Sequence, residues 1–459
     1  MKMHWLWFPT AVAIISGCQE RQDHNTTYQT YCSGCHGSQL QGTTSAAALI
    51  KPEWKDHAAR DSITASIRDG TPMTTMIAWG NLLTDHEIEG LVDFILMSQD
   101  KVPTQPRMVT NEVVSSEDYP LLIEPLLVDG LQTPWAIEFV DASTALISEK
   151  LGKLKWLVNN KLDTTSVKGL PQTHLESSTG GYMDIALDPN YRDNGWIYLS
   201  YSHTNGDMKD KNALALTKIV RGKIKNYQWV DQQPLFEVPD SLMVIRGNRW
   251  GCRFLFDDEK HLFFTIGDMA QDMDSQDPGK ATGKVFRIHR DGSIPRDNPF
   301  VNQPGAISAV FTVGNRNVQG LAIHPVTRAI WATEHGPKGG DELNILRKGL
   351  NYGWPIITYG IDYTDEIISD KTHAEGLEQP VWYWTPSIAV CSAEFCTSPL
   401  FPRWENNLLV GSLAFQELHR LVIEDDRVLH QEIVLKGKGR IRDMKFGYDG
   451  GLYILMNDP

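Results

Sequence analysis

The chain has 459 residues, of which 41% are hydrophobic and 22% are charged, so it can bury a sizeable core and is expected to form two or more domains. Its formal net charge of -14 argues against nucleic acid as a partner, because binding to a polyanion requires basic patches. No basic cluster in the sequence is longer than Lys436–Arg442.

Residues 1–18 have the features of an export signal. One lysine precedes an apolar run that is too short to span a bilayer, and small residues precede Cys18. Ile15-Ser16-Gly17-Cys18 resembles a bacterial lipobox, which implies cleavage before Cys18 and a membrane anchor through lipid on that residue. An ordinary signal peptide cleaved nearby is the alternative. Both predict an exported protein, and the lipobox predicts a membrane-anchored lipoprotein on the periplasmic side, where cysteines can be oxidised.

Residues 19–100 are predicted to form a small all-α cytochrome c domain. Cys32-Ser33-Gly34-Cys35-His36 has the C-x-x-C-H spacing of a c-type haem attachment site, in which both thiols bond to one porphyrin and His36 binds the iron. A redox dithiol or half of a zinc site would need a thioredoxin-like pattern or a second Cys/His pair nearby, and the sequence has neither. The segment therefore predicts covalently bound haem c.

The sixth ligand of the haem iron is predicted to be Met76, with Met73 as the alternative. The surroundings of Met76 resemble those of the methionine ligand in small class I cytochromes c, although Ile77 replaces the usual proline. Thr84 and Glu87 then form a capping-box pattern ahead of apolar residues at helical spacing. This pattern predicts a last helix that packs on the cytochrome core.

Residues 101–120 lose periodicity, are rich in proline, Ser/Thr and acidic residues, and are predicted to be a linker. From 121 to 459 a pattern of strand, Asp/Pro/Gly turn and second strand recurs. Its units start at Trp135, Met183, Arg253, Leu321 and Met444, and a weaker unit at 389–413 fills the long last interval. Six such units predict an all-β six-bladed propeller, closed by a strand from residues near Leu121.

The most polar connections of this domain lie between 312 and 355. Arg316 and Asn317 precede a strand-like run at Leu321–His324, and glycine, proline and acidic residues follow a second run at Ala329–Thr333. Glycine-rich backbone beside carboxylates suits a hard cation held by carbonyl and carboxylate oxygens. A polar turn without a ligand is the alternative.

The motifs GNRNVQGLA, EHGPKGGDELN and NYGWP in this stretch, with further motifs over 121–458, resemble the soluble aldose (glucose/sorbosone-type) dehydrogenase family. Members of that family bind pyrroloquinoline quinone (PQQ) on a six-bladed propeller. The resemblance implies that Arg316, Asn317, Arg440 and Arg442 bind the quinone, whose carboxylates favour guanidinium partners.

The same resemblance implies a calcium ion that polarises the reactive carbonyl of the quinone, with Gly336 and Pro337 as backbone carbonyl ligands. Asp341, Glu342 and Tyr352 match positions that the family uses around its metal sites.

Three positions depart from the family. Arg249 stands at the position of the general-base histidine, Ala414 at that of a quinone-binding lysine, and Thr179 at that of a glutamine. A guanidinium cannot accept the hydroxyl proton of an alcohol. We therefore expect slower aldose oxidation than in the family, with Arg249 compensating Ala414 as a partner for a quinone carboxylate.

Cys252, Cys391 and Cys396 remain after the haem and lipid cysteines are assigned. Three thiols form at most one disulfide. The resemblance places Cys252 and Cys391 near the pocket, so the pairs Cys252–Cys391 and Cys391–Cys396 stay as alternatives.

These features predict an exported, membrane-anchored oxidoreductase that oxidises an aldose or related alcohol at PQQ. Electrons pass to the haem c and then to a downstream respiratory acceptor. The alternative is a non-catalytic sugar- or protein-binding propeller with a degenerate quinone pocket, tethered to an electron-transfer cytochrome. Propellers of the hedgehog-interacting type belong to this second class, and the fold alone does not decide between the two.

Overall fold

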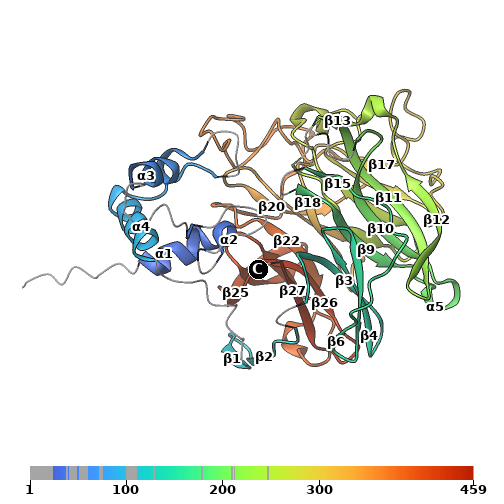
Figure 1. Ribbon diagram of the computed structural model, residues 1–459. Coiled ribbons are helices and arrows are strands. Elements are labelled where there is room, and N and C mark those ends of the chain that lie inside the picture. The colour runs from blue at the N-terminus through green and yellow to red at the C-terminus, as the bar shows by residue number, and fades with distance from the viewer. Residues whose placement is uncertain are drawn as a thin grey trace, which may run out of the picture.

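The computed structural model describes residues 24–37, 40, 49–50, 60–71, 76–99, 111–127, 130–176, 179–207, 210, 212–245 and 248–457. A small helical domain comes first, and a large β domain follows it (Figure 1). The expectations for the export signal, for Cys18 and for Met73 lie outside the described residues.

The helical domain contains α1 (His24–Tyr31), α2 (Ser33–His36), α3 (Arg60–Asp69) and α4 (Asp85–Met97). The predicted capping box is confirmed: the Thr84 hydroxyl accepts the amide of Glu87, and the Glu87 carboxylate accepts the amide of Thr84. The apolar stripe of α4 is buried in a core that it shares with α1 and α3. None of the helices in the described part of the chain combines the length and the apolar character needed to traverse a bilayer.

The β domain is a propeller of antiparallel sheets that follow one another in chain order. The first three sheets are β3 (Pro134–Asp141), β4 (Thr144–Glu149), β5 (Lys153–Val158) and β6 (Lys161–Leu162); β9 (Tyr182–Leu187), β10 (Ile197–Thr204), β11 (Leu214–Lys225) and β12 (Gln228–Phe236), with β13 (Val244–Ile245) paired to β11; and β14 (Phe254–Phe256), β15 (Leu262–Ile266), β16 (Lys284–Ile288) and β17 (Val310–Thr312).

The next two sheets are β18 (Val318–Ile323), β19 (Ile330–Glu334), β20 (Asp341–Leu346) and β21 (Trp382–Trp384); and β22 (Val390–Phe395), β23 (Leu408–Ser412), β24 (Glu417–Glu424) and β25 (Arg427–Lys436). Outside the sheets lie α5 (Tyr191–Asn194), the hairpin of β7 (Leu175–Glu176) and β8 (Thr179–Gly180), and the 3-10 turns η2 (Asp240–Leu242), η3 (Asp272–Gln276) and η4 (Pro402–Trp404).

The inner strands are apolar because sheets cover them from both sides. In β18 every residue but the last is buried, which fits a short apolar run bounded by turns. Gly320 lies in the middle of this strand, and a Cβ there would come within 2.4 Å of the Cys391 carbonyl oxygen of β22. The glycine therefore allows two neighbouring sheets to approach closely.

The sixth sector of the ring differs from the other five. It holds a sheet of two strands, β26 (Ile441–Phe446) and β27 (Leu452–Met456), and β26 contacts β22 on one side and β3 on the other. The propeller prediction is confirmed, with five sheets of at least four strands and this two-stranded sheet.

The strand expected near Leu121 is β2 (Pro120–Ile123), which pairs with β1 (Glu112–Ser115) rather than with the sixth sheet in the described residues. The apolar side chains of this hairpin pack in the same core as β26 and β27. The prediction of a linker over 101–120 is therefore wrong for its second half. Its acidic composition suggested a linker, but Glu117 pairs with Arg420 at 3.2 Å, so the acidic residues attach the hairpin to the propeller.

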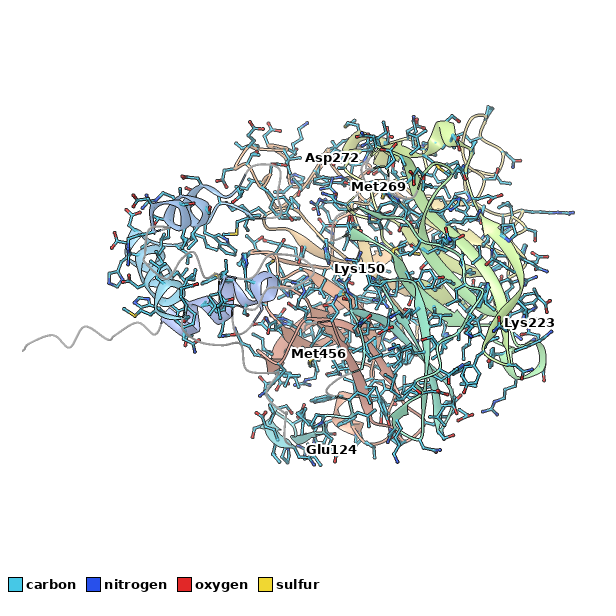
Figure 2. The ribbon with its side chains drawn as sticks, in the orientation of Figure 1. Glu124, Lys150, Lys223, Met269, Asp272 and Met456 are labelled. Carbon is cyan, nitrogen blue, oxygen red and sulfur yellow. The ribbon has the colours of Figure 1, made fainter. Side chains whose placement is uncertain are left out.

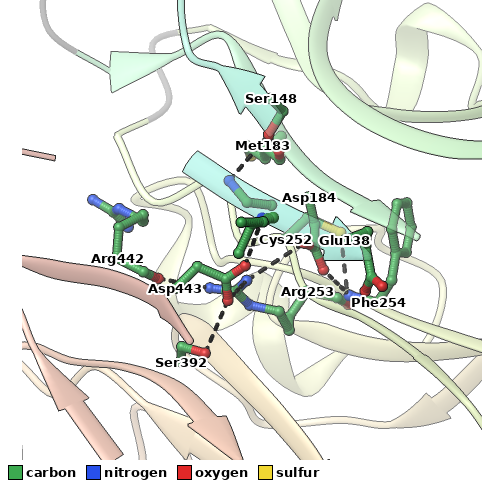
Figure 3. A network of polar contacts seen from close by, with 12 residues as sticks. Glu138, Ser148, Met183, Asp184, Cys252, Arg253, Phe254, Ser392, Arg442 and Asp443 are labelled. Atoms are coloured by element: carbon green, nitrogen blue, oxygen red, sulfur yellow. Dashed lines mark hydrogen bonds and ion pairs between the residues drawn. The ribbon is translucent and has the colours of Figure 1, made fainter. Parts of the chain in front are cut away.

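A buried ionic network joins the inner strands of several sheets (Figure 3). The guanidinium of Arg253 donates to Asp443 at 2.8 Å and to Asp184 at 3.4 Å, and also to the backbone carbonyls of Gln319 and Arg442 at 3.0 Å each. Burial raises the pKa of Asp184 to about 7. Buried charges are tolerated only when paired, so this network fixes how β26 meets its neighbours.

The cysteines of the propeller form no disulfide within the described residues. Cys252, Cys391 and Cys396 are all free and buried. The thiol of Cys391 contacts the Arg442 carbonyl at 3.1 Å.

Candidate active site

Several cations converge on one face of the propeller. Arg316 lies between β17 and β18, Arg440 and Arg442 lie at the start of β26, and Lys150 follows β4. Burial, together with the charges of Arg442, Arg316 and Arg440, lowers the pKa of His335 to about 3. Charges shift a pKa mainly at short range, so the structure brings the three arginines together around His335.

Lys150 joins this group and was missed by the sequence analysis. Burial, followed by the charges of Arg442 and Arg440, lowers its pKa to about 8. In Figure 2 Lys150 lies on the side of the propeller nearer the helical domain, whereas Lys223 lies at the far edge. Only the folded chain shows that Lys150 lies near these arginines, because a lone lysine after a strand has no distinctive sequence pattern. We call Lys150, Arg316, Arg440 and Arg442 the cation cluster.

Arg316 is held in place but retains an unused donor. Its Nη1 donates to the carbonyl of His335 at 3.0 Å and to that of Gly336 at 2.5 Å, and its guanidinium stacks 5.1 Å from the ring centre of Trp354. Its Nε and the Nε2 of His335 are buried without a hydrogen-bond partner in the part of the chain that the structure describes. Buried polar atoms of this kind suit an additional ligand.

Asn317 and Arg442 are positioned by Gln319 of β18. The Oδ1 of Asn317 accepts from the amide of Gly251 at 3.1 Å and from Gln319 at 3.3 Å. Arg442 donates to the side-chain oxygen of Gln319 at 3.1 Å, and its guanidinium stacks 5.4 Å from the ring centre of Trp135. Burial lowers the pKa of Arg442, and the charges of Arg440 and Arg253 lower it further.

Arg249, at the position of the expected general base, is paired with two carboxylates. Its Nε donates to Asp268 at 2.5 Å and its Nη2 to Asp272 at 2.8 Å. Asp268 also accepts from the indole nitrogen of Trp354 at 2.8 Å. Two of its nitrogens are thus committed to protein carboxylates, which speaks against Arg249 as a substitute partner for the quinone.

The two carboxylates differ in exposure. The side chain of Asp268 is 0% exposed and that of Asp272 is 44% exposed. Burial raises the pKa of Asp272, and the charge of Arg249 opposes this shift. Asp272 is the first residue of η3. The buried Nζ of Lys284 holds this turn in place, because it donates to three backbone carbonyls at 2.8–2.9 Å.

The expected calcium ligands lie beside the cation cluster. The carbonyl of Gly336 accepts from Arg316 at 2.5 Å, and that of Pro337 accepts from the Ser387 hydroxyl at 3.0 Å. Burial raises the pKa of Asp341 to about 6 and that of Glu342 to about 8. Within the described ranges no group of three His, Cys, Asp or Glu side chains could by itself hold a metal ion, so an ion here would depend on the carbonyl oxygens.

Thr179 and Ala414, the other two positions that depart from the family, have different neighbours. Thr179 begins β8 and accepts from the indole nitrogen of Trp250 at 3.4 Å. Ala414 lies against the helical domain: its carbonyl would be 2.9 Å from a Cβ placed on Gly34. Tyr352 is buried, and its hydroxyl donates to the Ile345 carbonyl at 2.7 Å.

The haem attachment residues lie on one turn of the helical domain. Cys32 caps α2, which carries Cys35 and ends at His36. Cys32 is buried in the domain core, and Met76 packs against the same core. Burial raises the pKa of the Cys32 thiol to about 12. The motif and Met76 thus line one core, which fits a haem between His36 and Met76.

Known proteins match both parts of the chain. A family model described as Glucose / Sorbosone dehydrogenase matches residues 131–459, and one described as Cytochrome C oxidase, cbb3-type, subunit III matches residues 19–95. Aldose sugar dehydrogenase YliI of Escherichia coli (strain K12) is 35% identical over 339 residues, which cover 72% of this chain and 89% of that protein.

Solved structures give the same result. The soluble aldose sugar dehydrogenase from Escherichia coli, in the apo-form, matches with a TM-score of 0.65 and 33% identity over 72% of this chain and 94% of that chain. The PQQ-bound aldose sugar dehydrogenase from Streptomyces coelicolor shares the fold, with a TM-score of 0.56 and 23% identity over 72% of this chain and 89% of that chain. The chain therefore belongs to the glucose/sorbosone dehydrogenase family and carries a cytochrome c domain ahead of its propeller.

Proposed function

We propose that the protein oxidises an aldose or a related alcohol at PQQ and passes the electrons to a haem c in its own helical domain. The cation cluster is the observation that carries this proposal. PQQ has three carboxylates, which suit the four cations and the two buried nitrogen atoms nearby that have no hydrogen-bond partner among the described residues. When bound, PQQ supplies the two-electron acceptor for the sugar.

The binding residues that we assign are Arg316, Asn317, Arg442 and Lys150. Arg440 contributes positive charge, although its Nη1 already donates to the Gly34 carbonyl at 2.7 Å. Calcium would be held by the carbonyls of Gly336 and Pro337, where it would compete with Arg316 and Ser387 for the same oxygen atoms.

Asp272 is the residue that we assign as proton acceptor. Oxidation of an aldose to its lactone breaks one C–H and one O–H bond and releases two electrons and two protons. Arg249 cannot accept a proton, and Asp268 is buried and fully paired, whereas Asp272 is partly exposed beside the cluster. Arg249 then acts as a positioning residue that holds both carboxylates.

The electrons are proposed to leave one at a time through the haem to a one-electron respiratory acceptor. Fusion of the carrier to the propeller raises its effective concentration, so the first transfer does not wait for diffusion. His36 and Met76 are the proposed iron ligands. Met76→Ala should remove the absorption band of methionine-ligated haem, and an unchanged band would assign the role to Met73.

The proposal of export and membrane anchoring is supported by the sequence alone. We propose that residues 1–18 are removed before Cys18 and that the bacterial modification adds several acyl chains, which hold a protein more firmly than one chain does. Mass spectrometry of the mature N-terminus tests this, and an unmodified Cys18 would contradict the anchor.

Reconstitution of the apo-protein tests the central proposal. The protein is titrated with PQQ and Ca²⁺, and aldose oxidation is then followed with an artificial dye as acceptor. We expect saturable PQQ binding and sugar-dependent dye reduction. The paired state of Arg249 favours a second function, a binding propeller without catalysis, and PQQ binding without any turnover would support that function.

A further inference from the structure

The cytochrome turn that carries the haem motif is seated on the propeller beside the cation cluster. The amide nitrogen of Gln416 donates to the Ser33 hydroxyl at 2.8 Å, and Arg440 donates to the Gly34 carbonyl at 2.7 Å. Ser33 and Gln416 are both buried. The Ser33 hydroxyl in turn donates to the Gln29 carbonyl at 2.7 Å, so its lone pair is directed at Gln416.

A second contact with the propeller involves another segment of the cytochrome domain, residues 78–81. Asn81 donates to Asp365 of the propeller at 2.8 Å, and Lys338 donates to the carbonyl of Ala78 at 3.4 Å. Lys338 and Asp365 also form an ion pair with each other. This pair therefore presents one donor and one acceptor to the segment 78–81.

The two contacts involve the two segments that carry the proposed iron ligands. Gly34 precedes His36 by two residues, and Ala78 follows Met76 by two residues. The cytochrome domain thus turns its ligand-bearing side to the propeller. Arg440 belongs to both regions, because its charge also lowers the pKa values of Lys150 and His335.

We propose that the surface formed by Lys338, Asp365, Ala414, Gln416 and Arg440, which we call the docking face, is the seat from which the cytochrome domain receives electrons. The inference rests on the proposed function. It adds that the cytochrome domain occupies one fixed position on the propeller and that the residues of the docking face determine this position. Arg440 is then a positioning residue for the cytochrome. The cytochrome domain can dock this closely only with glycine at position 34, because a Cβ there would lie 2.9 Å from the Ala414 carbonyl oxygen and 3.4 Å from Nη1 of Arg440.

The hydrogen bonds between the described residues of the two domains are few, as is usual between domains that can separate. Small changes should therefore undock the domain without unfolding it. Gly34→Ala suits this purpose, because Gly34 lies in a helical turn where alanine is favoured over glycine. Asn81→Asp changes the second contact by placing a carboxylate opposite Asp365. Ser62→Ala, at an exposed position of α3, is the matched control.

The experiment uses the full-length protein with haem and PQQ, and it has two readouts. Small-angle scattering of each variant measures whether the domain is seated, and rapid mixing with aldose measures the rate of haem reduction. For Gly34→Ala and for Asn81→Asp we expect a larger radius of gyration and haem reduction slowed by roughly tenfold, because contact must then form by diffusion. Ser62→Ala should match the wild type in both readouts.

Dye-linked aldose oxidation separates this inference from the proposed function. Both variants should keep the wild-type rate with the dye, because neither residue belongs to the cation cluster. Absence of dye reduction in the wild type would contradict the proposed function, and scattering would still report whether the domain docks. Unchanged scattering and unchanged haem reduction in both variants would overturn the docking face.

Discussion

The arginines on the two sides of the candidate site have different charged neighbours. Arg249 is paired with Asp268 and Asp272, whereas Arg442 lies next to Arg440 and Lys150. On the first side the protein supplies its own counter-charges, so the geometry is set before any ligand arrives. On the second side the cations lie close together, so that the charges of Arg442 and Arg440 lower the pKa of Lys150. The contrast supports the proposal that the first side carries the proton chemistry and the second side binds the cofactor.

Removing the exposed carboxylate of the paired side should have the largest effect. In Asp272→Asn we expect kcat to fall by about 10²- to 10⁴-fold, which is the usual loss when a general base is removed. PQQ affinity should stay close to that of the wild type. Asp274→Asn, in the same η3 turn, is the matched control. Equal kcat values for the two variants would contradict the role of Asp272.

Removing a charge from the cation cluster should instead weaken cofactor binding. For Arg442→Gln we expect the Kd for PQQ to rise by about 100-fold, since truncation of one partner of a buried charge pair costs about 2–5 kcal/mol. Fluorescence titration measures this change, and thermal unfolding checks the fold. Arg221→Gln, on strand β11 of the second sheet, should leave the Kd unchanged. A similar Kd for both variants would show that the cation cluster is not the quinone site.

Replacing Arg249 with a base tests whether the side of the site that holds Asp268 and Asp272 carries the proton chemistry. Arg249→His sets an imidazole beside Asp268, and we expect turnover with aldose and dye to increase by roughly tenfold. Arg249→Gln removes the charge without adding a base and should not increase turnover. If Arg249→His lowers turnover while PQQ stays bound, the guanidinium itself is required.

The pH dependence of PQQ affinity should report on Lys150. Its pKa of about 8 means that the amine is charged below that pH, and a carboxylate binds the charged form. Affinity should therefore be full below about pH 8 and decrease as the pH rises above it. Lys150→Met should remove this dependence and, because one ion pair is lost, weaken binding at low pH by roughly fivefold.

The same shift makes a prediction of opposite sign for stability. Without PQQ the folded state binds fewer protons at Lys150 than the unfolded state does, over the interval between the folded and the unfolded pKa. The free energy of unfolding should therefore increase as the pH rises above about 8. Urea denaturation of the wild type and of Lys150→Met, at matched pH values, measures this difference.

Local patterns in the sequence determined much of the architecture. The C-x-x-C-H spacing and the capping box of Thr84 involve neighbours in the chain, so their geometry follows from short-range rules. The strand–turn–strand repeat and the motifs around Arg316 likewise indicated a propeller and its family. Acidic composition gave the wrong interpretation of the β1–β2 hairpin, because its partner Arg420 lies about 300 residues away in the chain.

Tertiary structure alone decided how the charges are used. Lys150 joins the cation cluster from β4, Asp272 reaches Arg249 from η3, and Arg440 turns to Gly34 of the other domain. In each case the interacting residues are far apart in the chain, and their spacing follows no helical or strand periodicity. A sequence pattern therefore cannot predict these interactions. The physical reason is that a charge responds to whatever lies within a few ångströms, and only the closed propeller with its seated cytochrome sets those neighbours.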